Sequence, residues 1–198
     1  EQSIGVAAVL TLKGLRTCTR DWKRLIARPL GLLLCCLVVL AGCTGVPEGV
    51  VPVQGFDASR YLGTWHEVAR LDHSFERGLV DVTAEYSRND DGSIRVLNSG
   101  TDSSTGERDQ AEGRAVFVGA EDVAHLKVSF FGPFYGSYVV FELGENYDYA
   151  FVAGFNTDYL WLLARDREVS PTLRKRFIER AASLGFDTDS LIWATPET

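Results

Sequence analysis

The chain has 198 residues, which is enough for one domain with a sizeable hydrophobic core and too few for two ordinary domains. It carries 20 basic and 27 acidic residues, a formal net charge of −7. This balance argues against a nucleic-acid-binding protein, because such proteins need an excess of positive charge to contact phosphates.

The first 42 residues have the layout of a secretory signal peptide. Basic residues precede an uncharged apolar run from Leu30 to Leu40, and the small residues Ala41 and Gly42 follow it. The run is too short for a helix to cross a bilayer core. Residues 1–19 form a longer prelude than a signal needs, and we assign them to an upstream extension without a function.

Cys43 directly follows this apolar run. Leu40-Ala41-Gly42-Cys43 is similar to the bacterial lipobox, a resemblance that implies cleavage before Cys43 and acylation of its thiol and new amino terminus. Thr44 comes next, where Asp would favour the inner membrane, so we expect a lipid anchor in the outer membrane and a domain that faces the periplasm. The alternative is a buried apolar helix whose cysteine is incidental.

Cleavage at Cys43 changes the charge of the protein. Residues 1–42 hold six basic and two acidic residues, so the remaining chain has 14 basic and 25 acidic residues and a net charge of −11. Anionic headgroups repel such a body, and the acyl chains would therefore carry the membrane attachment. Residues 43–55 are expected to be the acylated cysteine and a flexible tether, rich in Pro and Gly, with the folded domain over residues 56–198.

From Trp65 onward, apolar and polar residues alternate with a period of two, which predicts β-strands. Strands are predicted at Trp65–Arg70, Val80–Arg88, Ile94–Gly100, Gln110–Val118, His125–Phe131, Ser137–Leu143, Tyr149–Ala153 and Leu160–Arg165. Short turns rich in Gly, Asn and Asp separate them. Eight evenly spaced strands predict an all-β fold, an antiparallel up-and-down barrel.

One helix is predicted after the eighth strand, with Ser170 as N-cap, Pro171 at its first position and Gly185 as its stop. Its apolar face consists of Leu173, Phe177, Ala181 and Leu184. A short strand over Leu191–Ala194 is expected to pair with the first strand of the barrel.

Two motifs at the ends of this pattern resemble signatures of the lipocalin family. The first is Gly63-x-Trp65 followed by Glu-Val-Ala-Arg, and the second is Arg165 at the end of the string LWLLAR. The sequence is most similar to bacterial outer-membrane lipocalins and to apolipoprotein D, over about residues 56–196. The resemblance implies an eight-stranded barrel with one C-terminal helix, a hollow interior, and a structural stack of the Arg165 guanidinium on the Trp65 ring.

Strand parity selects the side chains that would line the interior and bind a ligand. They are Ala84, Val96, Asn98, Ala115, Val128, Phe130, Tyr138, Tyr159 and Trp161, with Phe134 at the rim. Three further aromatic residues, Phe75, Tyr135 and Phe155, are expected beside Phe134 at the mouth. The small side chains in the lining, Ala84 and Ala115, favour an open cavity inside the barrel, and a solid core is the alternative.

The sequence gives little sign of catalysis. Its three histidines lack the spacing of metal ligands, and no nucleophile elbow, phosphate loop or dinucleotide fingerprint is present, so no cofactor or metal is predicted. Parity places Glu67 and Ala69 on the inner face with Trp65, and His66, Val68 and Arg70 outside. A buried Glu67 needs a fixed partner such as Arg165 or a tyrosine, although contact with a ligand headgroup is an alternative.

These observations predict a lipid-binding protein, not an enzyme. We expect it to bind, store or transport fatty acids or lysophospholipids for membrane maintenance. Two alternatives stay open: a lipocalin-type isomerase or de-epoxidase with a lipophilic substrate, and an interaction module with a filled barrel. A homodimer is compatible with the sequence, which does not decide the oligomeric state.

Overall fold

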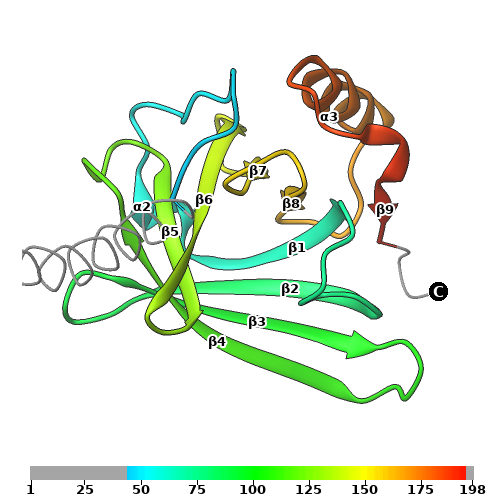
Figure 1. Ribbon diagram of the computed structural model, residues 1–198, viewed down its shortest axis with the longest axis horizontal. Helices are drawn as coiled ribbons and strands as arrows, with labels where there is room; N and C mark the ends of the chain where they lie inside the picture. The colour runs from blue at the N-terminus through cyan, green and yellow to red at the C-terminus, as the bar shows by residue number, and fades with distance from the viewer. Residues whose placement is uncertain (1–43, 195–198) are drawn as a thin grey trace, which may run out of the picture. The chain divides into compact units, whose positions relative to one another are not determined.

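The computed structural model describes residues 44–194, so the predicted signal peptide and Cys43 lie outside the described residues (Figure 1). The strands are β1 (Gly63–Arg70), β2 (Leu79–Arg88), β3 (Ile94–Asp102), β4 (Arg108–Phe117), β5 (His125–Phe131), β6 (Phe134–Leu143), β7 (Tyr149–Ala153), β8 (Leu160–Ala164) and β9 (Ile192–Trp193). The first eight pair with their neighbours, and β1 pairs with both β8 and β2, which closes the antiparallel barrel. The predicted fold class is therefore confirmed.

The helices follow their local sequence signals. Helix α3 (Pro171–Ser183) begins after Ser170, whose side chain accepts a hydrogen bond from the Leu173 N–H, and ends before Gly185 at φ +83°. The short helix α2 (Ala58–Tyr61) was not predicted, although Asp57 caps it through the Ser59 N–H. The chain ends with a 3₁₀ turn (Thr188–Ser190) and β9, which pairs with β1 as expected.

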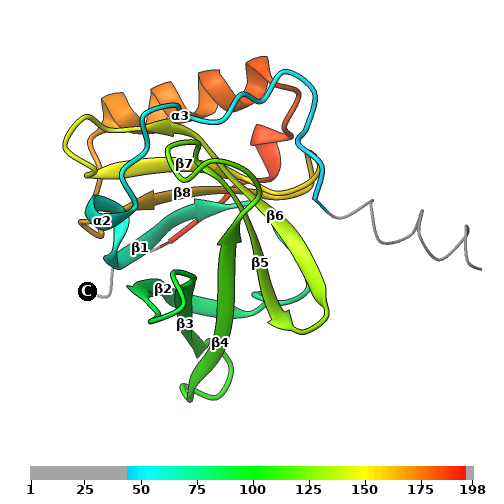
Figure 2. The same cartoon turned by 90° about the vertical axis from the view of Figure 1, so that its left-hand side faces the viewer.

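Apolar side chains form two separate clusters, one on each face of the barrel wall. The lumen cluster lies inside the barrel and includes Trp65 and Val140. The helix cluster lies between α3 and the outer face of β6, β7, β8 and β1 (Figure 2). Val140 lies in the lumen cluster, whereas its neighbour Phe141 belongs to the helix cluster. The helix thus covers one side of the barrel and leaves the lumen to the strands.

A β-bulge in β1 reverses part of the predicted parity. The register of β1 against β8 shifts between Glu67 and Ala69, so one extra residue turns the side chains beyond it to the opposite face. Ala69 therefore joins the helix cluster instead of the face of Trp65, and Arg70 points inward, opposite Trp161. The prediction that Arg70 lies on the outer face is therefore wrong, and its side chain is buried on the inner side.

The closed end of the barrel is held by Arg165. Its guanidinium carbon lies 4.0 Å from the centroid of the Trp65 ring, as the resemblance implied. It also donates to the carbonyl oxygens of Arg60, Leu62 and Thr64 at 2.7–2.9 Å, and its Nε donates to the carbonyl oxygen of Tyr147. One side chain therefore links the end of β8 to α2, to the start of β1 and to the β6–β7 turn.

The segment expected to be a flexible tether packs against the barrel. Val50 is buried in the helix cluster, and Val53 exchanges main-chain hydrogen bonds with Val140 and Ala124 at 2.9 Å. The Phe56 N–H donates to the carbonyl oxygen of Asp122. Within the described residues, the stretch before α2 is thus part of the folded domain and does not hold it at a distance from its N-terminus.

Strand β4 is paired along most of its length with β3 but along only a short part of it with β5. It pairs with β3 from Arg108 to Ala115, but with β5 only from Arg114 to Phe117. The first half of β4, residues 108–112, next to the β3–β4 loop, is exposed on both faces. A seam therefore separates this half of β4 from the β5–β6 hairpin.

Among the helices in residues 44–194, none is both long and apolar enough to cross a membrane.

The closed-end role of Arg165 gives a first test. We expect Arg165→Lys to lower the free energy of unfolding by about 2–4 kcal/mol, because lysine cannot serve four carbonyl groups and cover the indole at once. Urea denaturation measures this change. The control is Arg174→Lys, since Arg174 stacks on Trp193 at 4.8 Å on the outer surface and its loss should cost much less. Equal costs would show that Arg165 has no special role.

Candidate functional site

The barrel interior brings most of the predicted ligand-binding residues together. Antiparallel register places Trp65, Ala84, Asn98 and Ala111 in one row across β1 to β4, all on the inner face. The lumen cluster or its border includes Ala84, Val96, Ala115, Val128, Phe130, Tyr138 and Trp161. These side chains come from six strands and face a common space.

Burial divides this interior into a closed floor and an accessible upper part. Trp65, Val96 and Ala115 are at most 2% exposed, so the floor is tightly packed. Above it, Asn98 and Phe130 are only partly buried, and Ala111 is exposed although its register turns it inward. Inward side chains that keep accessible surface border space that solvent or a ligand can occupy.

The hydroxyls of three tyrosines form a hydrogen-bonded group in the lumen. The Tyr138 hydroxyl lies 2.7 Å from that of Tyr61 and 2.9 Å from that of Tyr86. Burial raises the pKa of all three hydroxyls, so they stay protonated and neutral. The group offers hydrogen bonds in otherwise apolar surroundings.

A cluster of buried polar side chains fills one side of the mouth, beneath the β1–β2 loop. Arg70 Nη1 donates to Glu67 Oε1 at 2.5 Å, and its Nη2 donates to the carbonyl oxygens of Glu76 and Leu79 at 3.1 Å. Glu76 accepts from Trp161 Nε1 at 3.2 Å and lies 3.1 Å from His73 Nε2. Glu67 does face inward, but its partner is Arg70 and not Arg165 or a tyrosine.

The pKa values of the two carboxyl groups in this cluster are shifted in opposite directions. Burial and then repulsion by Glu76 raise the pKa of Glu67 to about 8, and Arg70 only partly offsets these effects. Burial also acts on Glu76, but hydrogen bonds from His73 and Trp161 outweigh it and lower the pKa of Glu76. The two shifts favour the protonated acid at Glu67 and the carboxylate at Glu76. Arg70 Nε has no hydrogen-bond partner within the protein.

Aromatic rings continue the polar cluster to the rim. His73 stacks on Phe75 at 4.0 Å, and Tyr159 stacks between Phe155 and Trp161 with centroids 5.2 and 6.2 Å away. Tyr159 thus belongs to this wall of the mouth and not to the lumen cluster. Phe134 lies at the tip of the β5–β6 hairpin, 74% exposed, where it is outside the lumen.

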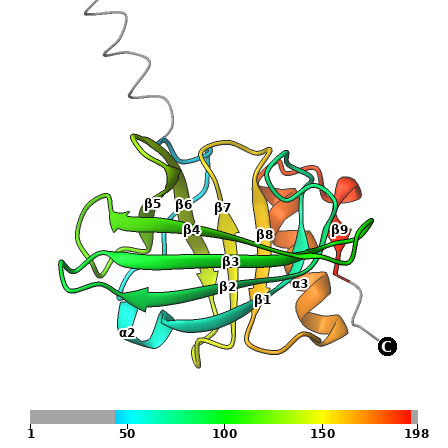
Figure 3. The ribbon, with the colours of Figure 1, turned by 90° about the horizontal axis from the view of Figure 1, so that it is seen from below.

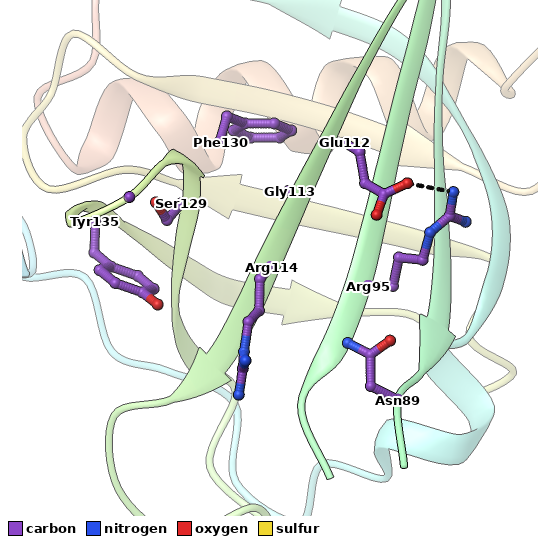
Figure 4. Close-up of a pocket in the computed structure, with 9 residues that line it drawn as sticks. Asn89, Arg95, Glu112, Gly113, Arg114, Ser129, Phe130 and Tyr135 are labelled. Carbon is purple, nitrogen blue, oxygen red and sulfur yellow. Dashed lines mark hydrogen bonds and ion pairs between the residues drawn. The ribbon is translucent and has the colours of Figure 1, made fainter. Parts of the chain in front are cut away.

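A pocket of about 360 Å³ lies at the seam between β4 and the β5–β6 hairpin (Figure 4). Its lining combines outward side chains with one inward ring: Asn89, Arg95, Glu112, Gly113, Arg114, Ser129, Phe130, Gly132 and Tyr135. Arg95 and Glu112 pair at 2.6 Å across neighbouring strands. Gly113 leaves room for Phe130, because a Cβ there would lie 2.8 Å from the Phe130 ring. The pocket therefore reaches the inner wall of the barrel from outside.

Sequence reasoning did not identify the polar cluster as a unit. Glu76 and His73 lie in a loop without periodicity, and the bulge that turns Arg70 inward has no sequence signature. Tyr86 has the same strand parity as Ala84, but alternation gives no reason to link it with Tyr61. In the described part of the chain, no group of three or more His, Cys, Asp or Glu side chains could hold a metal ion.

Comparisons with known proteins agree on a single family. The family model described as a lipocalin-like domain matches residues 56–196. The chain is 58% identical to an outer membrane lipoprotein Blc of Vibrio cholerae over 81% of this chain and 95% of that protein. The Escherichia coli K12 protein of that name is 49% identical over 79% of this chain and 89% of its own length.

More distant proteins share the family or the fold. Apolipoprotein D of Macaca fascicularis is 35% identical over 70% of this chain and 81% of that protein. Insecticyanin of the tobacco hornworm Manduca sexta has a similar fold, with a TM-score of 0.61 and 20% identity over 77% of this chain and 87% of that one.

The raised pKa of Glu67 predicts a pH-dependent stability. Burial raises the pKa of folded Glu67 to about 8 from the ordinary glutamate value of 4.5, so stability falls as pH rises through this window. Glu67→Gln mimics the protonated acid and removes this loss. Relative to the parent protein, we expect the variant to gain on the order of 1–4 kcal/mol of unfolding free energy across the window.

Denaturation at several pH values measures this difference. The matched control is Glu85→Gln, which removes an exposed carboxyl on the outer face of β2 and should keep the parent pH profile. A Glu67→Gln variant whose stability difference from the parent is constant with pH would show that Glu67 is ionised in the fold.

Proposed function

Because this chain belongs to the lipocalin family, we propose that it binds fatty acids or lysophospholipids in its barrel and stores or carries them at the outer membrane. Membership of the family implies a small hydrophobic ligand. Relatives at 49–58% identity are named outer membrane lipoproteins, and we assign the same location to this chain. Acylation of Cys43 is the proposed anchor.

The observation that carries the ligand proposal is the graded burial of the lumen. An acyl chain meets the partly buried apolar residues Ala84, Val128 and Phe130 above the floor and leaves its head beside Asn98. Each methylene that leaves water contributes about 0.8 kcal/mol, and ordering costs offset much of the sum. An affinity in the roughly micromolar range is expected.

The polar cluster supports a ligand with an acidic head. Arg70 carries a positive charge near the mouth, and its Nε–H is a buried donor without a hydrogen-bond partner in the protein. A carboxylate or phosphate near the mouth would be drawn toward Arg70, although the acidic body as a whole repels anions. The ligand head would therefore stay near the rim.

Ligand uptake can be tested at two adjacent positions of β4. A chain begun at Thr44 is titrated with a fluorescent fatty acid, with lysophospholipid as competitor. Ala111→Trp fills the upper lumen from an exposed inward position and should weaken binding at least about tenfold, or about 1.4 kcal/mol. Glu112→Trp places the same ring on the outer face and should leave the affinity unchanged.

The outcomes separate the three function classes. Saturable uptake that is lost only in Ala111→Trp supports binding within the barrel. Chemical conversion of the bound lipid, followed by mass spectrometry, would support an enzyme. No uptake by the parent protein would support an interaction module with a filled barrel.

The proposed anchor has its own test. We expect Cys43→Ser to abolish acylation, so that the protein leaves the outer-membrane fraction, and mass spectrometry of the N-terminal peptide checks the modification. Cys36→Ser, a change within the apolar run, should keep the membrane location. Membrane recovery of Cys43→Ser equal to that of the parent would contradict lipidation at this site.

A further inference from the structure

The N-terminal segment follows a fixed path along the outside of the barrel. Where the segment reaches α2, Phe56 packs on Tyr61 and Tyr147 at the closed end of the barrel. In the middle, Val53 is bonded to Val140, and Val50 is buried against the helix cluster. The segment is therefore bound to the wall at several points along its length.

The start of this segment lies at the open end of the barrel, opposite the closed end where Phe56 packs. A Cβ built on Gly45 would be 3.8 Å from the carbonyl oxygen of Phe155, in the β7–β8 loop. In Figure 3 the start of the described chain, the β5–β6 turn and the β7–β8 loop lie along the same upper side of the domain. Thr44, which directly follows Cys43, is thus held beside the mouth of the barrel.

The same end carries exposed aromatic side chains. Among residues 44–194, every exposed phenylalanine lies on an open-end loop or hairpin: Phe75 is 55% exposed, Phe131 78% and Phe134 74%. At the closed end, the exposed large hydrophobic residue is Val118, at 46%. Phe131 and Phe134 pair on one hairpin, and exposed aromatics at one end of a domain are typical of a surface that contacts an apolar partner.

We propose that the open mouth of the barrel faces the phospholipid bilayer, with Phe75, Phe131 and Phe134 in contact with its surface. The proposal rests on acylation of Cys43 and deepens the proposed function. Acyl chains on Cys43 enter the bilayer, and the packed segment after Thr44 leaves no free linker through which the domain could turn over. The anchor therefore fixes the orientation of the mouth.

The chemistry of the contact is apolar. The chain from Cys43 onward carries a net charge of −11, so anionic headgroups repel the body as a whole. Phenylalanine rings at the acyl boundary gain free energy without a basic patch. In this orientation a lipid passes between bilayer and lumen without crossing open water.

Site-specific probes test the orientation on the full acylated protein. Phe134→Cys at the hairpin tip and Val118→Cys at the closed end are each labelled with an NBD fluorophore. The proteins are reconstituted in vesicles of phosphatidylethanolamine and phosphatidylglycerol that contain doxyl-labelled lipid. We expect doxyl lipid to quench most of the emission at position 134 and to leave position 118 unquenched. Both sites are exposed, so the labels need not disturb the core.

A spacer variant tests the role of the short connection. A Gly/Ser insertion of about ten residues between Thr44 and Gly45 has a reach of roughly 18 Å and should reduce quenching at position 134. Phe131→Ser combined with the spacer should remove most of what remains. Equal quenching at both positions, or quenching at position 118 alone, would overturn the proposal.

These results are distinct from a failure of the ligand proposal. Fatty-acid titration in solution does not depend on how the domain is held, so uptake without the predicted quenching pattern would overturn the orientation alone. Quenching without uptake would preserve the orientation and exclude the ligand. Absence of the acyl group on Cys43 in the reconstituted protein would overturn the orientation, because the anchor is its premise.

Discussion

The contact of Arg165 with Trp65 is the constraint on which the barrel depends. A closed barrel must join its last strand to its first, and here a single guanidinium stacks on the β1 indole while it bonds to carbonyl groups before and within β1. Arg60 and Leu62 lie before β1, so their carbonyl groups have no neighbouring strand to pair with. Because this end is sealed, access to the lumen is left to the other end, where the polar cluster and the exposed aromatics lie.

The sequence predicts the strands and the helix because their signals are local. Alternation with a period of two survives along most of the strands, apart from register shifts in β1, β2, β5 and β6, and Ser170 and Gly185 bracket α3 by capping chemistry alone. The stack of Arg165 on Trp65 followed from family motifs and not from local pattern. Most inward residues were also correct, since parity needs only a regular strand.

The errors arise where one residue changes the count or where packing overrides composition. An extra residue in β1 reversed Ala69 and Arg70, and so the internal partner of Glu67 was missed. The N-terminal segment looked like a linker because of its Pro and Gly content, yet Val46 and Val50 contact the helix cluster on the outer wall. Such contacts join residues far apart in sequence, and a local reading of composition cannot contain them.

The incomplete pairing of β4 has a consequence for self-association. Backbone groups of residues 108–112 on the side of the seam have no strand beside them, and a free strand edge is a template for pairing with another chain. Arg108, Asp109 and Glu112 place charges of both signs along this edge, and Arg108 is further drawn to Asp81 on β2. A neighbouring molecule that extended the sheet here would have to strip water from these groups. The barrel thus keeps a gap in its wall that is guarded against fibril-like growth.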